Sequence, residues 1–331
     1  MARAKIRGLD CAAPAAKMIP LVLRAQLSAV CRHRDKALNW KDPEGVHDMR
    51  VLSRRLRSAI NDFSPYFRKG TLPRPKLRAI ANKLGDVRDE DVALMALREL
   101  KSKAKGTAGE GIKLVADEHR QRRKKARSAL KAILQEPGVE DFRKDFLARL
   151  RTITIATVAS SPGTQATQPA LSFQALGTQV IKVRIKDFTK ASPCLYLPAE
   201  IKRLHELRIL AKRLRYSIEL FSDCWGEEFA AMAKEVAHMQ TSLGELHDCD
   251  VWINDLGVRL KRTARKTTVD SSELKLRAGS AWLLKHFVAK RAEHYAAALE
   301  RWEQWQADGF LEKLGLMLDS GLPQTKSDQA T

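Results

Sequence analysis

The chain has 331 residues, and its 60 Lys and Arg against 39 Asp and Glu give a formal net charge of +21. A hydrophobic content of 44% excludes a disordered basic tail and is typical of a globular chain long enough for two domains, each with its own core. No apolar run approaches the roughly 18 residues that span a bilayer, and Lys17 interrupts any secretory signal near the start. The strong positive charge favours polyanions or an anionic surface as partners.

The five cysteines are odd in number and scattered, and no two of them form a CxxC pair: Cys11, Cys31, Cys194, Cys224 and Cys249. Such a set is typical of a reducing compartment, without structural zinc and without a disulfide framework. We therefore expect a cytoplasmic protein.

The predicted elements of the first half are helices. A first helix is expected over residues 18–38 and a second over residues 46–63, and Pro75 suits the first turn of a third. A fourth helix is expected over about residues 111–135, after a loop with the sequence KAKGTAGEG, and residues 140–158 can form a further one.

The helix over residues 46–63 has two contrasting faces. Seven apolar residues recur at intervals of three and four and fall within an arc of about 140°: Val46, Met49, Leu52, Leu56, Ala59, Ile60 and Phe63. His47, Arg50, Arg54 and Arg57 lie on the opposite side, within about 80° of one another, and Arg55 lies at the border. One face is suited to a core and the other to anions, although a basic face alone is usually only a solvated surface.

The second half of the chain repeats this pattern. Residues 204–221, LHELRILAKRLRYSIELF, align without a gap with residues 46–63, so that His205, Arg208, Lys212, Arg213 and Arg215 match His47, Arg50, Arg54, Arg55 and Arg57. Solubility does not require a histidine and arginines in a fixed register twice. The repeat therefore indicates a binding site, or two halves of one.

Two further segments repeat in the same order. Residues 180–188 align with residues 30–38, and residues 243–256 align with the segment that starts at Leu84; a last long helix is expected from about Ser272. Only ITIATV and VIKV resemble strands, and neither has a partner. We predict an all-α fold of two antiparallel four-helix units related by a pseudo-twofold axis. The predicted boundaries are residues 1–158 with a flexible start, a linker over residues 159–172, the second repeat over residues 173–318, and a disordered tail over residues 319–331.

Asp91 and Asp250 project onto the apolar faces of their helices. An isolated buried charge is costly, so each carboxylate must be paired or hydrogen-bonded. A structural ion pair is favoured over a catalytic acid or a metal ligand. Arg88, His247, Arg55 and Arg213 are the expected partners.

The motifs VHDMRVLSRRLR and LHELRILAKRLR, followed by LGDVRDEDV and LGELHDCDV, resemble the signature of the CHAD domain, the conserved histidine α-helical domain, over about residues 17–310. The resemblance implies one all-helical domain of two four-helix units, with a basic central surface that binds inorganic polyphosphate. Attachment to polyphosphate granules is compatible with such binding. The resemblance assigns to that surface His47, Arg50, Arg54, Arg55, Arg57, His205, Arg208, Lys212, Arg213 and Arg215, and less strictly Arg32, Lys36, Lys182 and Lys186. His119, Arg123 and Lys290, on the predicted helices that follow, are added as further candidates for the same surface. The ExExK motif of an attached triphosphate hydrolase domain does not occur, so a stand-alone, non-catalytic module is expected.

Other chemistries are weaker interpretations of these residues. His205 and Glu206 begin an HExxH motif, but position 209 is isoleucine, and the arginines near both histidines repel cations, so neither a metal nor a cofactor is expected. Nucleic acid is the main rival as a partner, because the charge suits it, but the repeated faces lack the Asn, Gln and aromatic residues that contact bases. A scaffold that docks an acidic protein is a further alternative.

Overall fold

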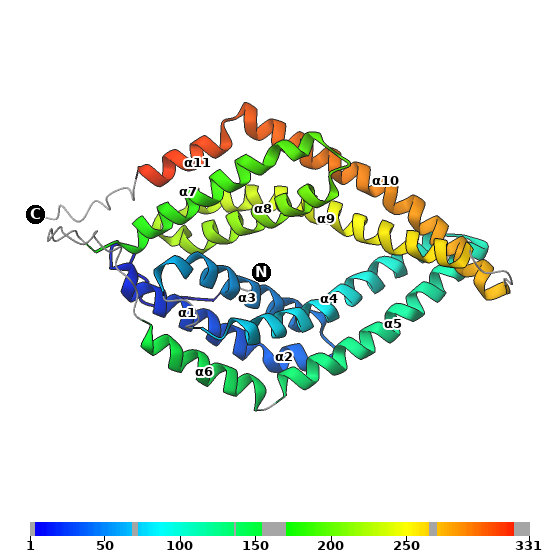
Figure 1. Cartoon of the computed structure of the whole chain (residues 1–331), viewed down its shortest axis with the longest axis horizontal. Coiled ribbons are helices and arrows are strands. Elements are labelled where there is room, and N and C mark those ends of the chain that lie inside the picture. Colours follow the sequence, from blue (N-terminus) through cyan, green and yellow to red (C-terminus); the bar gives the residue numbers. More distant parts are fainter. Residues whose placement is uncertain (1–3, 68–71, 136, 154–169, 265–269, 321–331) are drawn as a thin grey trace, which may run out of the picture.

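In the computed structural model, residues 4–67, 72–135, 137–153, 170–264 and 270–320 are described, and they form helices arranged in two halves (Figure 1). The first half contains α1 (Ala15–Arg32), α2 (Arg34–Leu38), α3 (Pro43–Asp62), α4 (Arg74–Lys103), α5 (Gly106–Leu134) and α6 (Gly138–Thr152). The second half contains α7 (Phe173–Ala191), α8 (Ile201–Phe221), α9 (Glu227–Ala264), α10 (Ser271–Ala307) and α11 (Phe310–Asp319). The all-α prediction is confirmed.

Several predicted boundaries shift. The helix expected over residues 18–38 breaks at His33, which separates α1 from α2. The strand-like VIKV lies inside α7, and most of ITIATV and of the expected linker lies outside the described residues. The predicted tail starts too early, because Asp319 ends α11. The start of the chain also differs from the expected flexible segment, since Ala4, Ile6 and Leu9 pack against the core.

The helix starts follow from local sequence. Asp42 caps α3 by accepting a hydrogen bond from the Glu44 amide at 2.9 Å, and Pro43 occupies the first turn, where its missing N–H costs nothing. Ser172 and Asp270 cap α7 and α10 in the same way. These caps satisfy amides that no earlier carbonyl can reach.

The apolar stripe of α3 is buried, as predicted, from Val46 to Phe63. Phe63 is fully buried against Phe173 of α7 and Phe221 of α8, with ring centroids 6.3 and 6.1 Å away. One continuous core extends from α1 through both halves to α11, and a smaller core lies where α4, α5, α9 and α10 meet. The two halves therefore share one core, in which Phe63 at the end of the α3 stripe packs against Phe221 at the end of α8.

At one end of the molecule α5 and α10 cross in backbone contact (Figure 1). A Cβ atom added at Gly111 would lie 1.8 Å from the carbonyl oxygen of Lys275, and one at Gly279 would lie 2.5 Å from the carbonyl carbon of Gly111. The segment GTAGEG, predicted to be a loop from its glycines, is instead the first turns of α5. Glycine is a poor helix former, but here it permits a close helix crossing.

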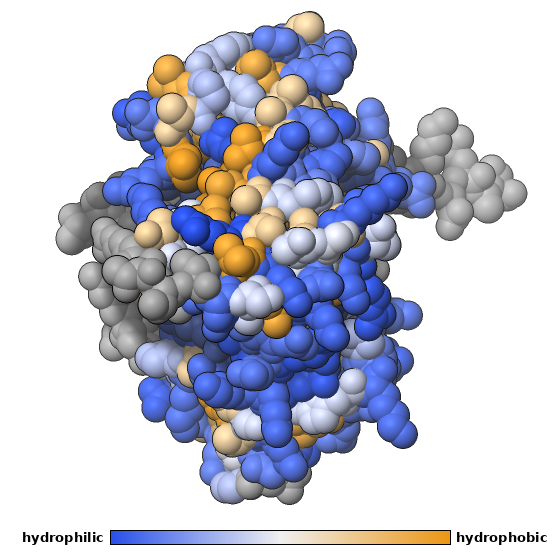
Figure 2. Space-filling model, turned by 90° about the vertical axis from the view of Figure 1, so that its right-hand side faces the viewer, coloured by the Kyte–Doolittle hydropathy of each residue, from blue (hydrophilic) through white to orange (hydrophobic). Residues whose placement is uncertain are grey.

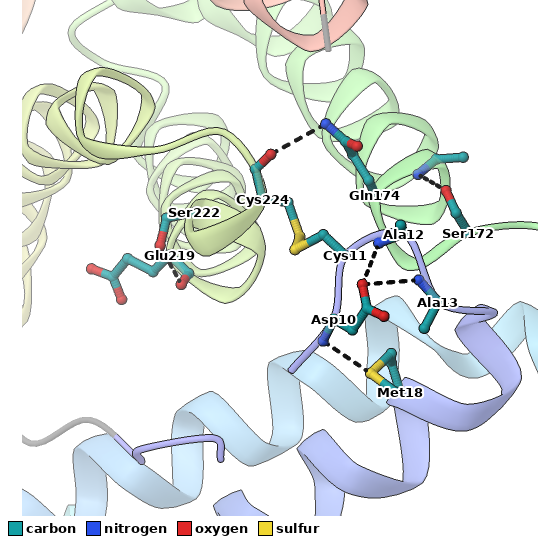
Figure 3. The surroundings of a disulfide bond; sticks show 11 residues. Asp10, Cys11, Ala12, Ala13, Met18, Ser172, Gln174, Glu219, Ser222 and Cys224 are labelled. Atoms are coloured by element: carbon teal, nitrogen blue, oxygen red, sulfur yellow. Dashed lines mark hydrogen bonds between the residues drawn. A yellow bond between two sulfur atoms is a disulfide. The ribbon is translucent and has the colours of Figure 1, made fainter. Parts of the chain in front are cut away.

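At the other end a disulfide joins the amino-terminal segment to the second half (Figure 3). Cys11 and Cys224 lie 213 residues apart in sequence, with their Cα atoms 5.4 Å apart. Around the bond, the Asp10 carboxylate accepts hydrogen bonds from the amides of Ala12 and Ala13, and the Gln174 side chain donates to the Cys224 carbonyl oxygen. The prediction of no disulfide is wrong, because only the folded chain brings these two cysteines together.

None of the helices described is both long and apolar enough to cross a membrane.

Candidate functional site: a central cation cluster

The basic faces of α3 and α8 are brought together where these two helices meet. Arg50, Arg54 and Arg57 on α3 lie close to Arg208 and Lys212 on α8, and we call these five residues the central cluster. Arg54 acts electrostatically on Arg50 and Arg57 on its own helix, and on Arg208 and Lys212 across the junction. Each half of the chain thus contributes part of one site.

The cluster is electrostatically unfavourable in the absence of an anion. Burial lowers the pKa of Lys212 to about 8, with repulsion from Arg54, Arg208 and Arg57 acting in the same direction. Burial, followed by repulsion from Arg54, lowers the pKa of Arg50 to about 10. Cations that are both partly desolvated and close to one another are suited to bind an anion that neutralises several of them at once.

Two aspartates border the cluster, and their role was not visible in the sequence. The Arg50 guanidinium donates to the Asp89 carboxylate of α4 at 3.2 Å, and Asp248 of α9 is the strongest charged partner of Arg208. Arg50 and Arg208 lie beside Gly85 of α4 and Gly244 of α9, where an added Cβ would be 3.7 and 3.9 Å from the arginine Nε atoms, an ordinary van der Waals contact. The segments LGDVRDEDV and LGELHDCDV therefore supply the carboxylates that face the arginines of the two basic faces.

Both aspartates are exposed to solvent at the border of the cluster. Desolvation by surrounding protein raises the pKa of Asp89, yet 72% of its side chain is exposed to solvent. The pKa of Asp248 is raised for the same reason, and each carboxylate repels the other. Asp89 lines a hollow between α4 and α5, together with Glu90 and Arg122.

The repeated histidines lie beside the cluster. Burial, and then repulsion from Arg88, lowers the pKa of His47; burial, and then repulsion from Arg208, lowers that of His205. The His205 and His247 rings are in contact, with their Nδ1 atoms 3.1 Å apart, and burial lowers the pKa of His247 to about 4. These imidazoles are therefore neutral at pH 7 and offer hydrogen bonds rather than charge.

Arg55 and Arg215, both predicted to bind the anion, instead pair with Glu219 of α8 at 2.8 and 3.3 Å. Arg215 is buried and lies over the Tyr216 ring at 4.9 Å. A second polar contact joins the halves nearby: buried Asp62 at the end of α3 accepts hydrogen bonds from Arg184 of α7 and from Ser217 of α8. Neither carboxylate was identified from the sequence, because a single acid in a helical pattern carries no signal.

The other assigned residues are more dispersed. Arg213 is exposed, and its charge lowers the pKa of Lys212. Arg32, Lys36 and Lys186 are exposed, and Lys182 pairs with Asp319 of α11 at 2.5 Å. On α5, His119 is buried against Glu90, and Arg123 donates a hydrogen bond to Asp91. On α10, Lys290 pairs with Glu293. Lys182, His119, Arg123 and Lys290 thus contact neighbouring side chains rather than the central cluster.

Asp91 and Asp250 both form ion pairs, but with arginines of α5 and α10 rather than with the predicted partners. Asp91 is 5% exposed and accepts from Arg123 and Arg127 of α5 at 3.3 and 3.4 Å. Asp250 accepts from Arg291 of α10 at 2.5 Å. These pairs tie α4 to α5 and α9 to α10, and so support the helices that hold Asp89 and Asp248.

The chain aligns with the crystal structure of the CHAD domain from the plant Ricinus communis with a TM-score of 0.64 and 19% identity, over 96% of each chain. It aligns with PptA from Streptomyces chartreusis with a TM-score of 0.62 and 15% identity, over 88% of this chain and 100% of that one. These likenesses show a shared fold. No curated protein matches the sequence.

A family model described as the CHAD domain matches residues 21–256, which include both histidine-arginine helices and both aspartate motifs. The match extends over more than half of the chain. The chain therefore belongs to the CHAD domain family.

Proposed function

We propose that the protein binds inorganic polyphosphate at the central cluster, as a non-catalytic module that attaches to polyphosphate granules in the cytoplasm. The observation that carries the proposal is the convergence of Arg54 and Arg57 with Arg208 and Lys212 across the α3–α8 junction. Phosphate oxygens are accepted well by guanidinium and ammonium groups, and a chain of phosphates can bridge both helices at once.

The composition of the cluster supports this ligand over one with bases. Tyr216 acts electrostatically on Arg50 and Arg208 of the cluster, but it is only 6% exposed and so offers little surface for stacking. An anion made only of phosphates needs no such surface. Membership of the CHAD family, whose resemblance implies polyphosphate binding, supports the same ligand.

The test compares two quadruple variants of equal net charge. Replacing Arg54, Arg57, Arg208 and Lys212 by alanine should weaken binding of long-chain polyphosphate by about 100-fold or more and lower the slope of log affinity against log salt by about 3. Because the removed cations repel one another, the melting temperature of this variant should stay the same or rise. Replacing the exposed Lys17, Lys190, Lys261 and Lys313 is the matched control.

Equal losses of affinity in the two variants would show that bulk charge binds the anion and would overturn the proposal. The same titrations, repeated with polyphosphates of increasing length, measure how affinity depends on the number of phosphates. Binding should strengthen with chain length until one molecule spans α3 and α8, and then level off. Competition with duplex DNA at matched phosphate concentration should leave polyphosphate bound.

A further inference from the structure

A second basic surface lies on α5, away from the central cluster. Two adjoining hollows share Arg120 and Arg123 and line one face of this helix with cations. We call this surface the α5 track. Its cations are Lys113, Arg120, Arg123, Lys124, Arg127 and Lys131 of α5, with Arg98 and Lys101 of the adjacent α4. From Lys113 to Lys131 it extends along about 27 Å of helix, the length of several phosphates in a row.

The track and the central cluster occupy opposite sides of the α4–α5 pair. Asp89, which bonds Arg50 of the cluster, lines a different hollow with Glu90 and Arg122. Asp91 lies two residues further along α4, about 200° around the helix, and faces Arg123 and Arg127 of the track. Figure 2 shows this end of the molecule, with hydrophilic residues over most of the lower part, on the side of α5, and an apolar band above.

The fold does not require these cations. Around Arg123, which bonds Asp91, the residues at −3, +1, +4 and +8 are Arg120, Lys124, Arg127 and Lys131. Around Arg291, which bonds Asp250 in the second half, the same steps give Val288, Ala292, Tyr295 and Leu299. The second half thus keeps the ion pair without the basic stripe.

Many of the track's cations are available to a ligand. Lys113, Lys124 and Lys131 are exposed, and none of them forms an ion pair with any residue in the described part of the chain. Arg123 and Arg127 are held in place by Asp91. The result is a row of three exposed lysines beside two guanidinium groups that are paired with Asp91.

The track also contains apolar surface, unlike the central cluster. The half-buried Trp40 indole lines one end of the track, with the Arg127 guanidinium 5.2 Å from the ring centroid. Half-buried Leu94 lines the other hollow, where Leu97 and Ala116 are buried. A chain of phosphates has nothing to place against such surface. A nucleic-acid strand with unpaired bases has phosphates for the lysines and flat apolar faces for the accessible parts of Trp40 and Leu94.

We propose that the α5 track binds single-stranded nucleic acid, at a site separate from the central cluster. The backbone phosphates lie along Lys113, Lys124 and Lys131, and a base packs beside Trp40. The site does not depend on the proposed polyphosphate site, because the two share no residue.

The test measures fluorescence anisotropy of a labelled oligo(dT) of about 20 nucleotides. The track variant Lys113→Glu, Lys124→Glu, Lys131→Glu should weaken binding by about 30-fold or more, against a small loss in the matched variant Lys17→Glu, Lys261→Glu, Lys313→Glu. Trp40→Ala should cost roughly tenfold, and Trp40→Phe much less. With the unaltered protein, an abasic oligonucleotide of equal length should bind roughly tenfold more weakly, which tests base contacts without any mutation.

Three results would overturn the proposal. The track variant and its control could lose the same affinity, which would mean non-specific attraction. Abasic and normal oligonucleotides could bind equally, which would show that phosphates alone are recognised. Polyphosphate binding could fall in the track variant as it does in the central variant, which would make the track an extension of the polyphosphate site. Retained polyphosphate binding in the track variant, with lost oligonucleotide binding, supports two separate sites.

Discussion

Individual residues were predictable from the sequence where they repeat. Arg50 with Arg208 and Arg54 with Lys212 were identified because each pair occupies one register twice, and all four meet in the central cluster. Asp89 and Asp248 repeat equally well but received no role, because a helical pattern does not show which residue of a neighbouring helix an acid will face. Glu219 and Asp62 do not repeat at all. Their partners arise only from tertiary packing.

Lys212 should make polyphosphate binding depend on pH. Folding lowers its pKa from 10.5 to about 8, so between these values the unfolded chain binds more protons and stability rises with pH. An anion favours the charged form, so affinity should increase as pH falls from about 9 to 7, with proton uptake on binding near pH 8. Calorimetry in two buffers of different ionisation enthalpy measures this uptake.

The matched control is Lys212→Arg, which keeps the charge throughout this pH range. It should bind polyphosphate well and lose the pH dependence. An unchanged pH dependence in this variant would assign the proton to another group.

Asp91→Asn should destabilise the fold without weakening polyphosphate binding. The change leaves Arg123 and Arg127 without their buried partner, and since 33% and 23% of these side chains are exposed, the expected cost is about 2–3 kcal/mol, below that of a fully buried pair. Thermal unfolding measures this loss. The control, Asp89→Asn, removes a carboxylate that is 72% exposed and should cost less than about 1 kcal/mol. Loss of binding at an unchanged melting temperature in Asp91→Asn would give this residue a direct role in the site.

At the scale of the element, helices were predictable from apolar periodicity, and their ends were not. The stripe of α3 predicted both its helical nature and its buried face, but the helix begins at Pro43, after the Asp42 cap, and not at residue 46 as expected. The first turns of α5 were predicted as a loop, because glycine's low helix propensity is visible in the sequence and its packing partner is not. The break at His33 likewise has no glycine or proline to mark it.

Gly111→Ala should destabilise the molecule by about 3 kcal/mol, because the new methyl group would meet the α10 backbone, which cannot move aside as a side chain can. Differential scanning calorimetry measures the change. The control is Gly257→Ala on α9, where no atom lies within 4 Å of the added Cβ. That substitution should stabilise the helix by up to about 1 kcal/mol. If both variants melt alike, α5 and α10 do not cross at this point.

At the scale of the whole molecule, the internal repeat predicted two similar halves but not how they share their interior. Each half alone satisfies the helical patterns, so nothing in the sequence required that Phe63 pack on Phe173 and Phe221. The pairing of Cys11 with Cys224 was equally hidden, because spacing in the chain says little about two residues that are 213 positions apart.

Reduction of the Cys11–Cys224 bond should lower stability by up to about 5 kcal/mol, since the bond restricts a very long loop in the unfolded chain. Unfolding in urea with and without reductant measures the loss. Cys11→Ser should remove the effect of reductant, and Cys31→Ser, at a free cysteine, should preserve it. Because cytoplasmic thiols are normally kept reduced, the expected cytoplasmic location would remove this contribution. A reductant effect that survives in Cys11→Ser would mean that another pair is oxidised.

The crossing of Gly111 and Gly279 also limits how this fold can diverge. Elsewhere in a core, a larger residue at one position can be offset by a smaller one opposite, so pairs of positions exchange volume over evolution. Here both partners are already glycine and the backbones themselves touch, so neither can give up an atom to accommodate the other. Relatives that keep this crossing should therefore retain glycine at both positions rather than show compensating pairs. In relatives that lack either glycine, α5 and α10 should lie further apart at this end of the molecule.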